Sequence, residues 1–354
     1  MEKPILGALL SVSSTTLTDE EKFLFEKHNP LGITLFSRNL ASVEQTKSLI
    51  KSIKEIIGRE DVIIALDQEG GRVNRLKSIG FSQYASQNIL GQANSEELTS
   101  LHAKIIARDM KSVGANFNMA PVLDINYPTT TDALKNRTFG NDKEQIANLG
   151  KVLCITYIEE GICPCLKHLP GHGKATCDPH LGVPIISCSL KDFENDLYPF
   201  QNLKNMPAAM TAHILIEQID NQNPITLSPI GIKKIIRESI GFDGLLLSDA
   251  IEMNALKGSM LERAKQSWLA GCDVVIYCAG KLAELNMLCN EGQILKDKSL
   301  ERFEKVKKII NLKKNTIILD NEEKRYYSST NQFVDEYINY DATEVLHQMQ
   351  KGDK

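Results

Sequence analysis

One stretch of the sequence, Lys167 to Pro184, gathers most of the side chains that could move a proton. It reads KHLPGHGKATCDPHLGVP and holds three histidines, one aspartate, three glycines and three prolines. Glycine and proline at this density break helices and strands, so residues 169–173 should be irregular chain at the surface. Asp178 and His180 are two residues apart, which lets the carboxylate hold the imidazole in one tautomer and stabilise its protonated form. This pair is a candidate acid/base dyad.

The same stretch also has the residue types of a metal site, because His168, His172, Cys177 and His180 cluster in it. Two histidines four residues apart face one ligand only on a helix, and Pro170 with the two glycines that follow it forbids that helix. A zinc site is therefore disfavoured, and we expect no metal and no cofactor.

Other polar residues come directly after apolar runs that have the composition of buried strands. In a (β/α)₈ barrel the carboxyl ends of all strands meet at one face, where the working residues sit. We therefore expect these side chains to converge. They are Asp67 and Glu69 after 62–66, Asp124 after 117–123, Lys167 and His168 after 162–165, His213 after 208–211, and Asp249 after 245–248.

Several of these residues also have a purely structural interpretation. Asp67 and Glu69 would only stabilise a turn if they paired with the arginines of the same turn. Asp249 would be no more than a helix N-cap, and His213 would be a satisfied core histidine. Glu252 fits the first turn of a helix, where the dipole favours acidic residues, and we do not count it as a site residue.

Three stretches together resemble the signature sequences of the family-three glycoside hydrolases. They are Asp67 to Arg75 (DQEGGRVNR), Lys167 to Pro184, and Ser248-Asp249. The pattern K-H-x-P-G-H-G-x(4)-D-x-H in the second stretch is highly specific. The resemblance extends from Gly32 to about Leu312 and is to the single-domain cytoplasmic β-N-acetylglucosaminidases of peptidoglycan recycling.

The resemblance implies roles for individual residues. Asp249 matches the catalytic nucleophile, and His180, oriented by Asp178 on a mobile loop, matches the general acid/base. The residues that match the groups holding the terminal sugar are Asp67, Arg75, Arg137, Lys167 and His168.

Three positions depart from the family pattern. Leu169, Pro179 and Ala250 stand where the family often has phenylalanine, serine and a second aspartate. These differences concern rate and loop geometry rather than reaction type, since the matched catalytic positions are intact.

A retaining glycosidase needs a carboxylate to attack the anomeric carbon and an acid to protonate the departing oxygen. An imidazole exchanges its proton near neutral pH, so it would act as acid in the first step and as base in the second. We therefore expect a covalent glycosyl-Asp249 intermediate and retention of the β configuration. The implied substrate is N-acetylglucosamine β-1,4-linked to anhydro-N-acetylmuramic acid, whereas the residues by themselves indicate only an exo-acting sugar pocket. A neutral imidazole repels anions less than a carboxylate does, so phosphate stays open as an acceptor besides water.

Other functions fit parts of the same pattern. A related β-glucosidase or broader hexosaminidase would share the signature stretches. A non-catalytic sugar-binding homologue should have lost Asp249, Asp178 or His180, and all three are present. A metal-dependent hydrolase would be sensitive to chelators.

The elements that must position these residues alternate along the chain. Continuous apolar runs indicate parallel strands buried on both faces, and they lie at 5–10, 32–36, 62–66, 117–123, 162–167, 208–213, 245–248 and 274–278. Helical patterns with capping signals, such as Ser42 before and Gly58 after the first of them, lie at 42–57, 95–113, 142–160, 228–240, 252–270, 281–289 and 300–312. This order predicts an α/β protein with a (β/α)₈ TIM-type barrel over residues 1–316. A doubly wound open sheet is the alternative that it favours less. Residues 317–354 form a polar tail without a domain of their own, with a short amphipathic helix near 341–349.

Composition limits the remaining function classes. The net charge of -4 with scattered Lys and Arg gives no surface for nucleic acid. No apolar run approaches the roughly 20 residues of a membrane span, and the N-terminal run is too short for a signal peptide. The eight cysteines lack the spacing of a disulfide framework, which indicates reduced thiols in a cytoplasm. We expect a monomer whose partner is a small carbohydrate.

Overall fold

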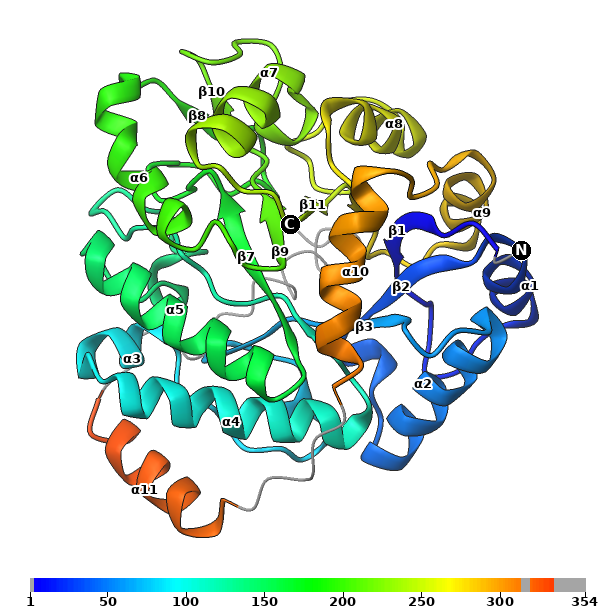
Figure 1. Cartoon of the computed structure of the whole chain (residues 1–354), viewed down its shortest axis with the longest axis horizontal. Coiled ribbons are helices and arrows are strands. Elements are labelled where there is room, and N and C mark those ends of the chain that lie inside the picture. Colours follow the sequence, from blue (N-terminus) through cyan, green and yellow to red (C-terminus); the bar gives the residue numbers. More distant parts are fainter. Residues whose placement is uncertain (1–2, 313–318, 334–354) are drawn as a thin grey trace.

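Eight short apolar segments pair in parallel and close on themselves as a barrel (Figure 1). The structure is a computed structural model, and it describes residues 3–312 and 319–333. Around the barrel the strand order is β1-β12-β11-β9-β7-β6-β3-β2, so each strand pairs with the barrel strands before and after it in the chain. The strands are β1 (Leu6–Leu10), β2 (Pro30–Leu35), β3 (Ile63–Leu66), β6 (Phe117–Asn118), β7 (Cys163–Leu169), β9 (Ala208–Thr211), β11 (Leu245–Ala250) and β12 (Val274–Ile276). The predicted (β/α)₈ barrel is confirmed.

Most of the helices form the outer ring and bury an apolar stripe against the barrel. The helices are α1 (Asp19–His28), α2 (Val43–Ile57), α3 (Gln87–Ala93), α4 (Glu96–Val113), α5 (Lys143–Glu159), α6 (Leu190–Asn202), α7 (Pro229–Gly231), α8 (Met260–Ala270), α9 (Leu282–Glu291), α10 (Lys298–Ile310) and α11 (Asp320–Thr330). Of these, α10 covers one end of the barrel and α11 packs on α3 and α4. The boundary signals of α2 act as predicted. Ser42 accepts the backbone N–H of Gln45 at its start, and Gly58 adopts a φ of 77° at its end.

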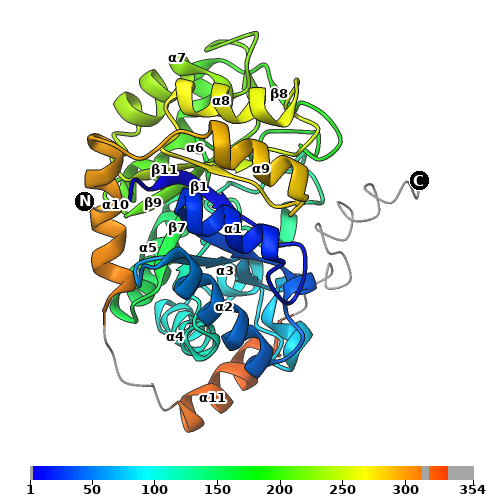
Figure 2. The same ribbon diagram turned by 90° about the vertical axis from the view of Figure 1, so that its right-hand side faces the viewer.

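One end of the barrel is closed by α10, which lies across it in both views (Figure 1, Figure 2). Phe303 and Val306 of this helix belong to the buried cluster that fills the barrel, together with residues at the strand starts such as Leu31, Cys163 and Leu245. The barrel is therefore a packed core and not a channel. A substrate site is left to the opposite end, where the strands finish.

Three predicted elements differ in extent from those observed. Only Phe117–Asn118 of the run 117–123 forms a regular strand, because Pro121 offers no N–H to a ladder. The predicted helix 228–240 begins as α7 at Pro229 and continues as a π-helical segment over Ile232–Ser239. The predicted helix 252–270 begins only at Met260, where Ser259 and Glu262 form a capping box.

Residues 169–173 were expected at the surface and are instead buried. The strand β7 continues to Leu169, and the backbone N–H of His172 donates to the Asp124 carboxylate at 2.6 Å. A Cβ on Gly173 would stand 1.9 Å from the carbonyl oxygen of Ile125, so only glycine fits there. The irregular chain is thus held inside the barrel mouth, and it reaches the surface from about Thr176.

Two smaller sheets and the last described helix complete the structure. A hairpin of β4 (Gln68–Gly70) and β5 (Val73–Asn74) follows β3, and β8 (Ile185–Ile186) pairs with β10 (Leu215–Ile216). The helix α11 lies in the segment predicted as a polar tail, whereas the predicted helix at 341–349 falls outside the described residues. Within residues 3–312 and 319–333, no helix has the length and apolar character to cross a bilayer.

Candidate active site

A single pocket at the ends of the strands brings the predicted site residues together. It has an empty volume of about 870 Å³, its open mouth included. The polar residues predicted from the sequence that line it are Asp67, Arg75, Arg137, Lys167, His168, Asp178, His180 and Asp249. Apolar side chains, among them Phe36, Met119, Met210 and Ile276, form the rest of the wall.

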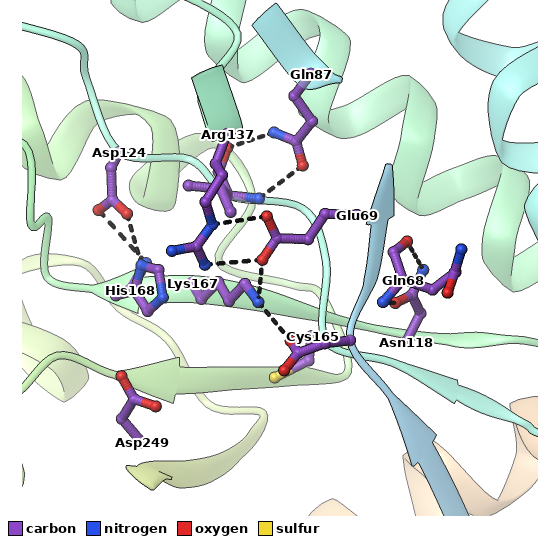
Figure 3. A network of polar contacts seen from close by, with 12 residues as sticks. Gln68, Glu69, Gln87, Asn118, Asp124, Arg137, Cys165, Lys167, His168 and Asp249 are labelled. Carbon is purple, nitrogen blue, oxygen red and sulfur yellow. Dashed lines mark hydrogen bonds and ion pairs between the residues drawn. The ribbon is translucent and has the colours of Figure 1, made fainter. Parts of the chain in front are cut away.

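Glu69 holds the cationic side of the pocket in place (Figure 3). Arg137 donates two parallel hydrogen bonds to its carboxylate, both of 2.8 Å, and Lys167 Nζ lies 2.5 Å from Oε1. Lys167 Nζ also donates to Asp67 Oδ1 at 2.8 Å, and Arg75 Nη2 lies 3.7 Å from Asp67 Oδ2. Burial would lower the pKa of Lys167, but Asp67 and Glu69 together raise it above its ordinary value. The two cations are therefore charged and fixed at the pocket wall.

The local pairing considered for Glu69 is wrong. Its partners are Arg137 and Lys167, which are 68 and 98 residues away in the chain, and not the arginines of its own turn. The pairing of Asp67 with Arg75 does occur, at the 3.7 Å already noted. Glu69 itself is not among the residues that line this pocket, so it supports the site from behind.

Asp124, which follows β6, fixes the orientation of His168. Its Oδ2 lies 2.7 Å from His168 Nδ1. Burial would raise the pKa of Asp124, but the neighbouring His168 lowers it, so the residue is a carboxylate. An anionic acceptor beside Nδ1 keeps a ring proton on that nitrogen. It also orients the ring so that Nε2 faces the pocket.

His172 is a pocket residue to which we assigned no role from the sequence. The residue is 3% exposed, and neither ring nitrogen has a hydrogen-bond partner among the described residues. Burial lowers the pKa of His172 to about 4, so the imidazole is neutral. A neutral imidazole offers one donor and one acceptor, the same pair of functions as a sugar hydroxyl.

The dyad forms in the loop between β7 and β8. Asp178 Oδ1 lies 2.6 Å from His180 Nδ1 and accepts the backbone N–H of His180 at 2.9 Å. Burial would raise the pKa of Asp178, but its hydrogen bond with His180 lowers it below its ordinary value. The loop tip is tied down at its backbone, since Asn254 donates to the carbonyl of His180 and Ala255 N donates to that of Pro179, at 2.9 and 3.0 Å.

Asp249 projects from the end of β11, on the side of the pocket where Lys167 and His168 also lie (Figure 3). Its carboxylate accepts the backbone N–H of Ala250 at 2.8 Å. Burial would raise the pKa of Asp249, but His213 and His168 lower it below its ordinary value, so the group is ionised. The residues that tether the His180 loop, Asn254 and Ala255, belong to the turn that follows Asp249, which brings the dyad and Asp249 to one pocket.

Two further residues near Asp249 have structural partners. His213 is fully buried, with Nε2 2.9 Å from the carbonyl of Ala250 and Nδ1 2.8 Å from Thr226 Oγ1, as expected of a satisfied core histidine. Glu252 was expected in a first helical turn and lies instead in the turn before α8, where its Oε1 accepts the backbone N–H of Cys278 at 2.8 Å. Burial raises the pKa of Glu252 to about 7.

A closed barrel with buried carboxylates, cations and histidines in its carboxyl-end mouth defines a barrel enzyme for a polar substrate. Comparison with known proteins specifies the class. The family model described as "Glycosyl hydrolase family 3 N terminal domain" matches residues 5–312. This chain belongs to glycosyl hydrolase family 3 and is a glycoside hydrolase, as the sequence resemblance predicted.

Individual relatives cover most of the chain. A beta-hexosaminidase of Neisseria gonorrhoeae (strain ATCC 700825 / FA 1090) is 35% identical over 282 residues, which are 76% of this chain and 77% of the relative. The structure of native NagZ from Neisseria gonorrhoeae has a TM-score of 0.79 and 30% identity, and covers 93% of this chain and 97% of its own. The same protein in complex with N-trifluoroacetyl-D-glucosamine has a TM-score of 0.79 and 29% identity over the same shares.

Proposed function

We propose that this protein is a retaining exo-β-N-acetylglucosaminidase that releases terminal β-linked N-acetylglucosamine through a covalent glycosyl-Asp249 intermediate. The observation that carries the proposal is that an ionised Asp249 and the Asp178–His180 dyad line the same pocket. Relatives named beta-hexosaminidase, and a relative bound to a glucosamine derivative, support the choice of an N-acetylated amino sugar.

In the first step Asp249 acts as nucleophile and His180 as acid. A carboxylate oxygen of Asp249 bonds to the anomeric carbon while the bond from that carbon to the aglycone oxygen breaks. The protonated imidazole of His180 gives its Nε2 proton to the departing oxygen, and Asp178 stabilises the imidazolium through Nδ1.

In the second step the imidazole that has lost its proton acts as base. It takes a proton from water, whose oxygen attacks the anomeric carbon and displaces the carboxylate of Asp249. Two inversions leave the sugar in the β configuration. The dyad returns to its protonated state, so the cycle closes.

The terminal sugar is held by the remaining pocket groups. Asp67 accepts hydrogen bonds from ring hydroxyls, because its side chain is 20% exposed whereas Glu69 behind it is 1% exposed. Arg75, Arg137 and Lys167 donate to hydroxyl and acetamido oxygens, and His168 contributes its free Nε2. The pocket lies in the barrel mouth above a packed core and opens only outward, which suits the end of a chain better than its interior.

The natural substrate in this proposal is N-acetylglucosamine linked to anhydro-N-acetylmuramic acid, in the recycling of peptidoglycan fragments. We place the enzyme in the cytoplasm as a monomer. All eight cysteines are free thiols, four of them in the strands of the barrel and the helices around it, which suits a reducing compartment.

The test is a steady-state assay of the wild type with an aryl β-N-acetylglucosaminide and an aryl β-glucoside, with and without a chelator. The proposal expects turnover of the amino sugar, little of the glucoside, and no effect of the chelator. Asp249→Ala should lower kcat by at least about a thousandfold, the range in which loss of a catalytic group falls. Preference for the glucoside, or an active Asp249→Ala variant, would contradict it.

A further inference from the structure

The helix α11 lies beyond the segment that the family model matches, which ends at residue 312. It packs on the outside of the barrel beside α3 and α4 (Figure 1, Figure 2). Glu323 accepts from both terminal nitrogens of Arg108 on α4, at 2.5 and 3.1 Å. The helix is thus attached to the catalytic domain by specific contacts.

Tyr326 is the residue of α11 that reaches deepest, and it is fully buried. Its hydroxyl accepts the backbone N–H of Ala85 at 2.9 Å and lies 2.7 Å from His102 Nδ1. Burial lowers the pKa of His102 to about 4, so the ring is neutral. Because the hydroxyl oxygen already accepts from Ala85, its proton is available for Nδ1, and the proton of His102 then sits on Nε2.

Both partners of Tyr326 press against the turn that follows β3. A Cβ on Gly70 would stand 2.1 Å from the carbonyl oxygen of Ala85 and 3.1 Å from Cε1 of His102. Next to it, the backbone N–H of Gly71 donates to the carbonyl of Tyr84 at 3.0 Å. The backbone of this turn therefore rests on the segment 84–85 and on the His102 ring, with no space between them.

The turn in question carries Asp67 and Glu69. Glu69 directly precedes Gly70, and its carboxylate fixes Arg137 and Lys167. Asp249 and the dyad stand on different elements, β11 and the loop after β7. A displacement of Gly70 would thus move the groups assigned to the sugar and leave the nucleophile and the acid in place.

We propose that Tyr326 is a positioning residue of this enzyme, through which α11 holds the turn of Asp67 and Glu69 in its sugar-binding geometry by way of Ala85 and His102. The inference rests on the proposed function, because it takes Asp67 and the Glu69 cluster as the sugar-binding groups. It assigns to α11, in the segment that the sequence indicated only as a polar tail, a part in substrate binding.

The test compares Tyr326→Phe with Tyr84→Phe. Tyr84 is a matched control, since it is 1% exposed, lies in the same interface, and donates its hydroxyl to Asp109 at 2.7 Å. Its contact with the turn is made by the backbone carbonyl that accepts from Gly71, and Tyr84→Phe leaves that carbonyl unchanged. Each substitution removes one buried hydroxyl, so both should lower Tm by a similar amount. A purely structural role for Tyr326 predicts no further difference between them.

A positioning role predicts a separation of KM from kcat. Tyr326→Phe should raise KM for the aryl β-N-acetylglucosaminide by about 3-fold to 10-fold, with kcat within about 2-fold. The reason is that the turn binds the sugar equally in the ground state and in the transition state, so its displacement weakens binding without slowing the bound substrate. Tyr84→Phe should leave both constants at the wild-type values. Should Tyr326→Phe fail to fold, Glu323→Gln, which weakens the attachment of α11 at the Arg108 contact, should raise KM in the same direction.

The outcomes separate this inference from the proposed function. An active wild type whose KM is unchanged in Tyr326→Phe, or changed equally in both tyrosine variants, overturns the positioning role and leaves the proposed function intact. A wild type without activity on the amino sugar overturns the proposed function itself.

Discussion

Replacement of Glu69 by glutamine should damage stability and substrate binding together. The Glu69 side chain is 1% exposed and receives two hydrogen bonds from Arg137 and one close contact from Lys167. Glutamine keeps the shape, but it has no charge and turns an NH₂ donor toward one of the two cations. One buried cation then faces a donor where it had an acceptor.

The size of the effect follows from these contacts. Removing one partner of a buried ion pair costs about 3–5 kcal/mol, because the other charge is left uncompensated. Asp67 still holds Lys167 at 2.8 Å in the variant, so the lower end, about 3 kcal/mol of unfolding free energy, applies. Arg137 would also lose its position and with it one charged hydrogen bond to the sugar, which contributes about 1.5–3 kcal/mol. The value of kcat/KM should then fall roughly 10-fold to 100-fold.

The pH dependence of this loss has a definite sign. Burial would raise the pKa of Glu69, but Arg137 and Lys167 hold it well below its usual range. A carboxylate with a lowered folded pKa contributes stability that is complete above its unfolded pKa of about 4.3 and is lost as the pH falls through the folded value. The difference between wild type and Glu69→Gln should therefore be constant from pH 6 upward.

The measurement is urea unfolding at pH 7 together with kcat/KM on an aryl β-N-acetylglucosaminide. Glu291→Gln is the control, because Glu291 pairs with Lys265 at 3.0 Å but its side chain is 54% exposed. An exposed pair contributes at most about 1 kcal/mol, so the control should resemble the wild type in both measurements. Equal stability of Glu69→Gln and wild type would refute the role given to this cluster.

Two further predictions concern proton transfer and pH. His180→Ala should lower kcat/KM by about 10²-fold to 10⁴-fold for substrates with poor leaving groups and much less for activated aryl glycosides; equal losses on both would count against His180 as the acid. Glu252, whose folded pKa of about 7 is raised by burial, contributes stability that is complete below pH 4.5 and lost as the pH rises through 7. Between pH 4.5 and pH 8 the unfolding free energy of the wild type should therefore fall by up to about 3 kcal/mol relative to that of Glu252→Gln, as measured by urea unfolding of both proteins. Parallel stability curves would show that Glu252 does not titrate in this range.

Local signals were enough to predict the barrel. Continuous apolar runs placed all eight strands, since burial on both faces leaves no alternation to confuse with an exposed sheet. Caps such as Ser42 and Gly58 marked helix ends because they act within four residues. The start of α8 was missed although Ser259 and Glu262 carry the same kind of signal, because the acidic Glu252 upstream was taken for a first turn.

The contacts between distant residues could not be predicted in the same way. The strand ends were expected to converge, but nothing near Glu69 indicates Arg137 or Lys167 as its partner, and nothing near His168 indicates Asp124. Each pair joins residues that follow or end different strands, and only the closed barrel brings them together. Tyr326 stands in a polar segment whose composition suggests no core contact, yet its ring is fully buried. Burial of residues 169–173 was missed for a related reason, since glycine and proline indicate irregular backbone and say nothing about what covers it.

The role of Asp249 is tested most directly by trapping the intermediate. The wild type would be incubated with a 5-fluoro derivative of an activated N-acetylglucosaminide, digested, and sequenced by mass spectrometry. The account predicts one glycosyl group on the peptide that contains Asp249, attached to that carboxylate. A label on any other residue would contradict it. So would hydrolysis of the reagent without any labelling of the enzyme, if the released sugar had the inverted configuration.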